Sequence, residues 1–105
     1  MTKLLLVFVK ETDTWRDGPL YQALVQRLRQ LEMAGATAQA GIMGFGRHHR
    51  VHHKGLFGIS DDRPVTIAAV DEEAKVRAAA RELRAMAPEA LIIVIDVEEV
   101  EGRTP

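Results

Sequence analysis

Four strand-like runs alternate along the chain with longer stretches that mix apolar and polar residues. Two of the runs, Leu4–Val9 and Leu91–Ile95, are apolar at every position. A continuous apolar run with β-branched members is typical of a strand that is buried on both faces. The other two runs are weaker, with Pro64 at the entry of the third. We expect strands near residues 3–10, 36–45, 64–70 and 90–97.

The stretches after the first and third runs show helical periodicity. Their apolar positions recur three and four residues apart, at Leu20, Leu24, Leu28 and Leu31, and at Val76, Ala79, Ala80, Leu83 and Met86. Such spacing indicates an amphipathic helix with one buried face. Pro19 suits a first turn, and Gly35 suits a C-terminal stop. Acids at 71–73 suit the start of the second helix. We expect helices near 19–34 and 71–86.

The expected order is βαββαβ, which is the ferredoxin-like arrangement of a four-stranded antiparallel sheet with two helices on one face. The fold class is therefore α+β. Two helices cover only one face of such a sheet, yet Leu4–Val9 and Leu91–Ile95 are apolar at both parities. An uncovered second face would expose a large apolar patch. We therefore expect the chain to self-associate through that face.

Length and charge narrow the classes of protein that fit. A chain of 105 residues is expected to form one domain, spanning residues 1–105, with a long loop at about 46–61. The net charge of −1 argues against a nucleic-acid partner, which requires a clearly basic face. The chain has no cysteine, so it has neither disulfides nor thiolate chemistry. The first apolar run is too short for a membrane span, and we expect a cytoplasmic protein.

The segment from Gly41 to Lys54 gathers the candidate chemistry. Residues 46 to 55 carry Arg47, Arg50 and Lys54 without an acid, so this stretch has a charge of +3 while the remainder sums to −4. An isolated cationic loop on an acidic body suits a small anion. Two interpretations of its glycines stay open. They either let backbone amides approach a ligand or simply form a turn or bulge. Arg47 either binds phosphate or carboxylate or is a solvated or paired cation.

All four histidines lie in the same segment. His48 and His52 are four residues apart, as are His49 and His53, which would suit metal binding from one helical turn. Neither carboxylate nor cysteine lies within the cluster, so no metal site is predicted. A metal-binding or metal-tolerance protein that uses His48, His49, His52 and His53 remains the alternative function.

The residues give little support for a catalytic function. Ser60 is the only serine and stands in a loop beside acids, without a recognisable triad. The glycine-rich segment lacks the lysine and hydroxyl of a Walker loop. We expect a protein that is not an enzyme. Trp15, the only tryptophan, suits a place in the core or a subunit interface, or stacking on an adenine.

Several motifs point to one superfamily. Gly44-Phe45-Gly46-Arg47, leaving the second expected strand and opening a long loop, resembles the start of the T-loop in PII signalling proteins. Further motifs resemble the PII-like family called domain of unknown function 190, and these are Gly18-Pro19-Leu20-Tyr21, Ala34-Gly35-Ala36-Thr37, Gly41-Ile42-Met43-Gly44-Phe45-Gly46 and Ser60-Asp61-Asp62-Arg63-Pro64-Val65. The resemblance extends from Leu4 to Val100.

The resemblance implies a homotrimer with the sheets packed inward and ligand sites in the clefts between neighbouring subunits. In PII proteins an adenine nucleotide lies there, with its phosphates at the base of the T-loop. The ligand-binding residues expected from the match are Gly44, Phe45, Gly46, Arg47, His48 and Arg50. The implied role is signalling, in which the loop relays the effector to a regulated membrane transporter or enzyme.

Two departures from the PII pattern narrow the expected effector. The lysine- and glycine-containing loop before the last strand is replaced by Met86–Ala90, and the arginines after that strand are replaced by Glu98, Glu99 and Glu101. AMP, ADP, a cyclic nucleotide or another small anion therefore fits better than ATP, and no cofactor is required. The tyrosine that is uridylylated in some T-loops has no counterpart, because Tyr21 is on the first helix. A sensor, a metal-binding protein and a structural adaptor remain the three hypotheses.

Overall fold

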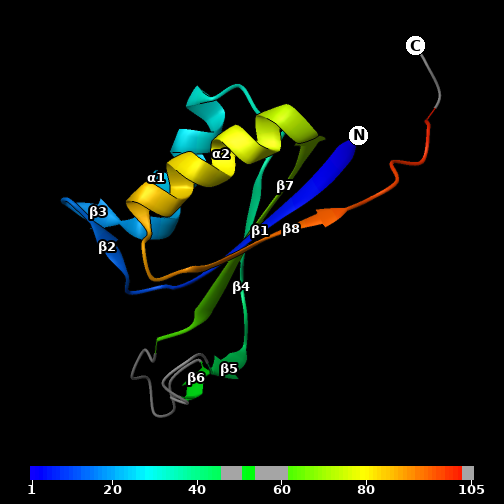
Figure 1. Cartoon of the computed structure of the whole chain (residues 1–105). Helices are drawn as coiled ribbons and strands as arrows, with labels where there is room; N and C mark the ends of the chain where they lie inside the picture. Colours follow the sequence, from blue (N-terminus) through cyan, green and yellow to red (C-terminus); the bar gives the residue numbers. More distant parts are fainter. Residues whose placement is uncertain (46–50, 54–61, 103–105) are drawn as a thin grey trace.

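The computed structural model describes residues 1–45, 51–53 and 62–102, with only the backbone for 51–53. The elements in chain order are β1 (Thr2–Lys10), β2 (Thr14–Trp15), β3 (Gly18–Pro19), α1 (Leu20–Gln30), β4 (Thr37–Ala40), β5 (Met43–Phe45), β6 (Val51–His53), β7 (Pro64–Glu72), α2 (Glu73–Met86) and β8 (Leu91–Asp96). Strands β4, β7, β1 and β8 form an antiparallel sheet in that order. Both helices lie across one face of it (Figure 1). The predicted α+β, ferredoxin-like fold is confirmed.

The core lies between the helices and one face of the sheet. Odd-numbered residues of β1 and β7 point to this side, and Val7 and Ile67 are fully buried. The expected helix faces supply the other half. Leu20, Leu24 and Leu28 of α1 are buried, as are Val76, Ala79 and Leu83 of α2. Ion pairing ties the outer sides of the helices together, since Arg27 Nε donates to Glu82 Oε1 at 2.9 Å.

The other face of the sheet is apolar and carries no helix. The strand register sets even-numbered residues of β1 and β7 beside odd-numbered residues of β8, in three rows across the sheet: Val70, Leu4 and Ile95; Ala68, Leu6 and Ile93; Thr66, Phe8 and Leu91. Leu91 is 53% exposed and Ile95 41% exposed. Within one chain, the expectation that the first run is buried on both faces is therefore wrong. We call these nine residues the open face.

Several element boundaries differ from the sequence predictions. The second strand is not continuous over 36–45 but divides into β4 and β5, and β5 leaves the main sheet to pair with β6. The first helix ends at Gln30, before Gly35, and Glu32 adopts a left-handed φ of 61° just beyond it. Asp71 and Glu72 extend β7 instead of beginning a helix. Tertiary strand pairing overrides local capping signals at these positions.

Two strand pairs were not expected from the sequence. The hairpin of β2 and β3 precedes α1, with Arg16 in a left-handed conformation (φ 55°) at its turn and its guanidinium 4.2 Å from the ring centre of Trp15. Trp15 packs against the core, as one interpretation of this residue predicted. The second pair joins β5 to β6, and β6 lies within the stretch 47–60. The structure describes only Val51–His53 of that stretch.

Candidate functional site

The chain passes close to itself where β4 ends and the long loop begins. The N–H of Gly41 donates to the carbonyl of Pro64 at 2.6 Å. A Cβ on Gly41 would lie 2.8 Å from Pro64 Cγ, and one on Gly44 would lie 3.2 Å from the same atom. A Cβ at residue 41 does not fit against the proline ring, and one at residue 44 would be in tight contact with it. These two glycines therefore hold the start of the loop against the start of β7.

The returning end of the loop is fastened to the end of β1. Arg63 donates through Nε to Glu11 Oε1 at 3.2 Å and through Nη2 to Oε2, and the N–H of Thr12 donates to Asp62 Oδ1 at 3.1 Å. The hydrogen bond from Arg63 lowers the pKa of Glu11 below its ordinary value. The N–H of Glu11 also donates to the carbonyl of Arg63 at 2.8 Å. The start of the loop is thus attached to the start of β7, and its end is attached to the residues that follow β1.

The predicted ligand-binding residues fall only partly within the described chain. Gly44 and Phe45 lie in β5, opposite the backbone of His52 and Val51 in β6. The side chain of Phe45 is 66% exposed. Residues 46–50, which hold Gly46, Arg47, His48, His49 and Arg50, lie outside the described residues, so their grouping stays a prediction.

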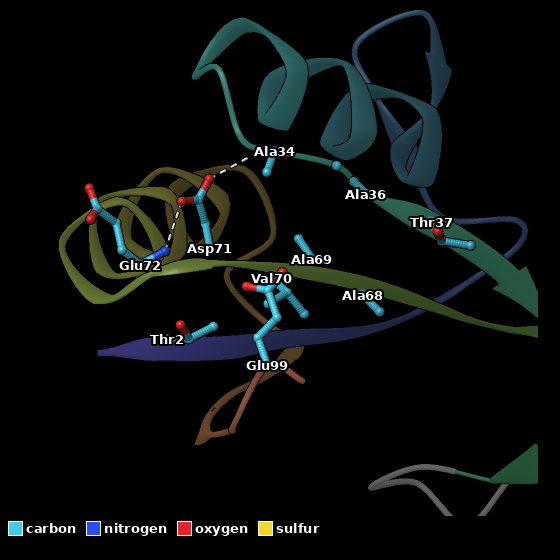
Figure 2. A pocket seen from close by; sticks show the side chains of 11 residues that line it. Thr2, Ala34, Ala36, Thr37, Ala68, Ala69, Val70, Asp71, Glu72 and Glu99 are labelled. Atoms are coloured by element: carbon cyan, nitrogen blue, oxygen red, sulfur yellow. Dashed lines mark hydrogen bonds between the residues drawn. The ribbon is translucent and has the colours of Figure 1, made fainter. Parts of the chain in front are cut away.

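A cavity of about 600 Å³ lies at the opposite end of β4 and β7 from the loop. Its lining residues come from the starts of β1 and β4, the end of β7 and the tail after β8: Thr2, Ala34, Gly35, Ala36, Thr37, Ala68, Ala69, Val70, Asp71, Glu72 and Glu99 (Figure 2). Three of them, Ala68, Val70 and Thr37, belong to strands at the border of the open face. The cavity therefore opens where a second copy on that face would approach.

A free stretch of strand edge lines this cavity. The carbonyl of Pro64 accepts from Gly41, on the β4 side, so even-numbered residues of β7 direct their backbone groups toward β4. Pairing with β4 ends at Ala68, opposite Thr37. The N–H and carbonyl of Val70 consequently face the cavity without a partner strand. They offer one donor and one acceptor side by side.

Asp71 holds the neighbouring wall in place. Its carboxylate accepts from the N–H of Ala34 at 2.9 Å and from the N–H of Glu72 at 2.7 Å (Figure 2). These backbone donors, that of Glu72 first, lower the pKa of Asp71, with a smaller contribution from Lys75. Lys75 Nζ also donates to the carbonyl of Glu32 at 2.6 Å. The segment from α1 to β4 is thereby fixed to the start of α2.

The cavity residues were not among those predicted from the sequence. The Ala34–Thr37 motif was noticed, but only as a mark of resemblance, because nothing in a sequence shows that β4 stops short of Val70. Glu72 and Glu99 add negative charge to the lining, and neither carboxylate has an ion pair or hydrogen bond within the described part of the chain. Among the described residues, no Lys or Arg lines the cavity.

The connection between α2 and β8 is held by an arginine from the helix. Arg84 Nη1 donates to the carbonyls of Ala87, Pro88 and Ala90 at 3.1, 2.9 and 2.8 Å. Cations near a helix C-terminus satisfy its last carbonyls in this way. Arg84 thus satisfies three carbonyls of this connection from within the chain. The connection lacks the lysine and glycine that PII proteins carry at this place.

Two negative findings concern the described residues alone. In residues 1–45 and 62–102 no group of three or more His, Asp or Glu side chains is arranged to hold a metal ion. No helix there is long and apolar enough to cross a membrane.

Comparison with known proteins decides the family. The model of the DUF190 family, described as an uncharacterized ACR, matches residues 2–99. The chain belongs to the DUF190 family. A UPF0166 protein of Aquifex aeolicus is 30% identical over 98 residues, which are 93% of this chain and 92% of that protein. A UPF0166 protein of Methanocaldococcus jannaschii is 28% identical over 103 residues, 97% of this chain and 94% of its own. The predicted resemblance is therefore confirmed.

Solved structures place this DUF190 chain in the PII-like fold. CPII of Thiomonas intermedia K12, described as a nitrogen regulatory PII-like protein bound to ADP, AMP and bicarbonate, aligns with a TM-score of 0.69 at 17% identity, over 91% of this chain and 85% of its own. The divalent ion tolerance protein CutA1 of Ehrlichia chaffeensis aligns with a TM-score of 0.65 at 14% identity, over 95% and 84%. At these identities the likeness establishes the fold alone.

Proposed function

We propose that this DUF190 protein is a PII-like trimeric regulatory protein. It binds a small anionic effector, of the adenine nucleotide type, in clefts between subunits and relays its presence through the long loop to a protein partner. The observation that carries the proposal is the open face together with the cavity at its border.

The open face argues for association with copies of the same chain. Its nine residues form three apolar rows across β7, β1 and β8, without a charged side chain among them. Full burial of an exposed Val, Leu, Ile or Phe side chain contributes roughly 1.5–3 kcal/mol, and the larger residues of the open face, already partly buried, contribute a part of this each. A closed ring of identical copies covers this face on every subunit. The PII-like fold makes a trimer the specific proposal.

The distance between the cavity and the loop base argues for a site built from two subunits. Val70 lies six residues along β7 from Pro64, so the cavity and the loop base of one chain are about 20 Å apart. A small anion in the cavity therefore does not reach the loop of its own chain. Between two copies, the loop of one subunit comes to the cavity of its neighbour, which unites the predicted anion grip with the free edge of Val70.

The charges of the loop and the cavity indicate which end of the effector binds to each. The loop stretch carries +3, whereas the cavity lining holds carboxylates and no cation. The phosphate therefore belongs with Arg47, Arg50, His48 and the amides of residues 44–46, and the base belongs in the cavity. CPII, of the same fold, is described as bound to ADP and AMP. This role requires no catalytic step, so the protein acts as a sensor rather than an enzyme.

Relay to a partner is assigned to the long loop. Gly41 attaches one end to Pro64 of β7, and Arg63 attaches the other end to Glu11 after β1, so a ligand held at the loop base acts on a segment whose attachments are fixed. Effector contacts then shift the loop between arrangements that a membrane transporter or an enzyme distinguishes.

Calorimetry with AMP, ADP, ATP, cyclic AMP and Zn²⁺ tests the proposal. We expect micromolar binding of AMP or ADP, and Arg47→Ala should weaken it by about ten- to a hundredfold, as expected for loss of a charge-assisted hydrogen bond. Arg29→Ala, an exposed arginine on α1, is the matched control and should bind normally. Absence of nucleotide binding, or equal affinity of the Arg47 variant, would contradict the proposal.

A further inference from the structure

We propose that Glu99 is a specificity-determining residue of the effector site, where its carboxylate accepts an N–H from the uncharged end of the ligand. This inference rests on the proposed function and goes further, because it states which ligands the cavity admits. The expected class is a monoanion or dianion whose other end bears an amino group, such as a 6-aminopurine nucleotide. A ligand with an oxo group at the same place is disfavoured.

Glu99 is the carboxylate of the lining that has no partner within the described residues and is directed toward β7. The carboxylate of Asp71 is already occupied by the N–H groups of Ala34 and Glu72. Figure 2 shows the Glu72 side chain at the outer end of the cavity, whereas Glu99 extends from the tail after β8 toward β7. Within the described residues Glu99 has no hydrogen bond or ion pair.

The tail is held so that Glu99 stays at this place. The N–H of Val97 donates to the carbonyl of Thr2 at 3.3 Å, which continues the pairing of β8 with β1 beyond Asp96. Lys3 Nζ pairs with Asp96 across the same strands, and Lys3 is only 7% exposed. Two residues later the chain reaches the cavity at Glu99. The tail is therefore held to the sheet as far as Val97, two residues before Glu99.

The chemistry of the three polar groups sets the selectivity. Val70 supplies one N–H donor and one carbonyl acceptor, and an ionised carboxylate only accepts. A ligand edge with an acceptor and an amino group satisfies Val70 and leaves a second amino hydrogen for Glu99. An oxo group in place of the amino group would direct its lone pairs at the carbonyl of Val70 and the carboxylate of Glu99, which are both acceptors. Buried acceptors left without a donor cost affinity, which is how such sites reject close analogues.

The same carboxylate keeps the anionic end out of the cavity. A phosphate there would face the charges of Glu99 and Glu72 with no cation in the lining. The ligand is thereby oriented with its phosphate pointing out of the cavity. In the sequence, the acids after the last strand are only a departure from the PII pattern, whereas the cavity gives one of them a role.

Competition between AMP and IMP tests the role of Glu99. These nucleotides differ at the 6-position, amino in AMP and oxo in IMP. For the full-length protein we expect calorimetry to show AMP binding about ten- to a hundredfold more tightly than IMP. In Glu99→Gln the preference should fall to within about threefold, because the amide both donates and accepts. Glu101→Gln, a tail acid that does not line the cavity, should keep the wild-type preference.

The outcomes separate this inference from the proposed function. Tight AMP binding with the same AMP-to-IMP ratio in wild type and Glu99→Gln would overturn the role of Glu99 and leave the sensor function standing. A loss of preference in Glu101→Gln as large as in Glu99→Gln would show a general charge effect of the tail and would also overturn it. If neither nucleotide binds the wild-type protein, both proposals fail. Circular dichroism confirms that each variant is folded.

Discussion

Gly41 and Pro64 meet at the point where the long loop leaves and rejoins the sheet. The N–H of Gly41 donates to the carbonyl of Pro64 at 2.6 Å, and the position of a Cβ on Gly41 lies 2.8 Å from Pro64 Cγ. That distance is shorter than carbon atoms tolerate, and the proline ring has no alternative rotamer to withdraw into. The contact therefore requires glycine at residue 41.

Gly41→Ala should destabilise the protein by about 1–3 kcal/mol, as overpacking does elsewhere. Urea unfolding followed by circular dichroism measures the change. Gly18→Ala is the matched control, since nothing lies within 4 Å of the Cβ position at Gly18. It should alter the free energy of unfolding little. Equal stability of wild type and Gly41→Ala would show that the strand and proline separate without cost.

The two layers of this fold could be predicted from the sequence because they depend on the periodicity of apolar residues. Alternation in β1 and the spacing of leucines in α1 are repeated signals, and each reports which residues are buried together. The predicted ends of helices and strands were wrong where tertiary strand pairing determines them. Asp71 has the composition of a helix cap, but antiparallel pairing with Lys3 keeps it in β7. The break in the second strand at Gly41 likewise depends on Pro64, which is distant in sequence.

The candidate site could likewise be predicted only in part. Gly44 and Arg47 were found because glycines and cations close in sequence form a local pattern. The cavity was missed because its walls come from four separate segments, and because the free edge at Val70 exists only where β4 ends. A prediction of the site from sequence alone would need the length of β4 relative to β7.

Leu6→Glu should convert the assembly to single chains. Leu6 lies in the middle row of the open face, between Ala68 and Ile93, so a carboxylate there would be buried unpaired on association. The side chain points away from the core, and the monomer should stay folded. Light scattering at micromolar concentration should give a trimer mass for wild type and the mass of one chain for the variant. Gln22→Glu on the exposed side of α1 should leave the trimer intact.

Acid should weaken the attachment of the loop through Glu11. Its pKa is lowered by the hydrogen bond from Arg63, so the folded state binds the proton less readily than the unfolded chain. The stabilisation is complete above the ordinary glutamate pKa of about 4.3 and is lost as pH falls through the lowered pKa of the folded state. Unfolding midpoints between pH 6 and pH 3 should fall less steeply for Glu11→Gln than for wild type. Parallel curves would refute the linkage.

Zinc titration addresses the alternative function. Under the sensor proposal, wild type and a variant with His48→Ala and His52→Ala should both bind AMP, and the double variant should lose less affinity than Arg47→Ala does, because Arg47 supplies a charge-assisted hydrogen bond. Neither should bind Zn²⁺ at micromolar concentration. Strong Zn²⁺ binding by wild type that the double variant loses, together with unchanged AMP affinity in Arg47→Ala, would replace the sensor with a metal-binding protein.

Subunit complementation tests the claim that one effector site is built from two copies. Arg47→Ala removes the anion grip of the loop, and Thr37→Trp fills the cavity from an exposed position that lines it. Each variant alone should bind no AMP at concentrations that saturate wild type. Co-expressed in equal amounts, the two variants should form mixed trimers in which about one quarter of the sites pair an intact loop with an intact cavity. Calorimetry should then show wild-type affinity at about one quarter of the wild-type stoichiometry. Mixed trimers that bind no AMP would place both halves of the site in one chain and contradict the account.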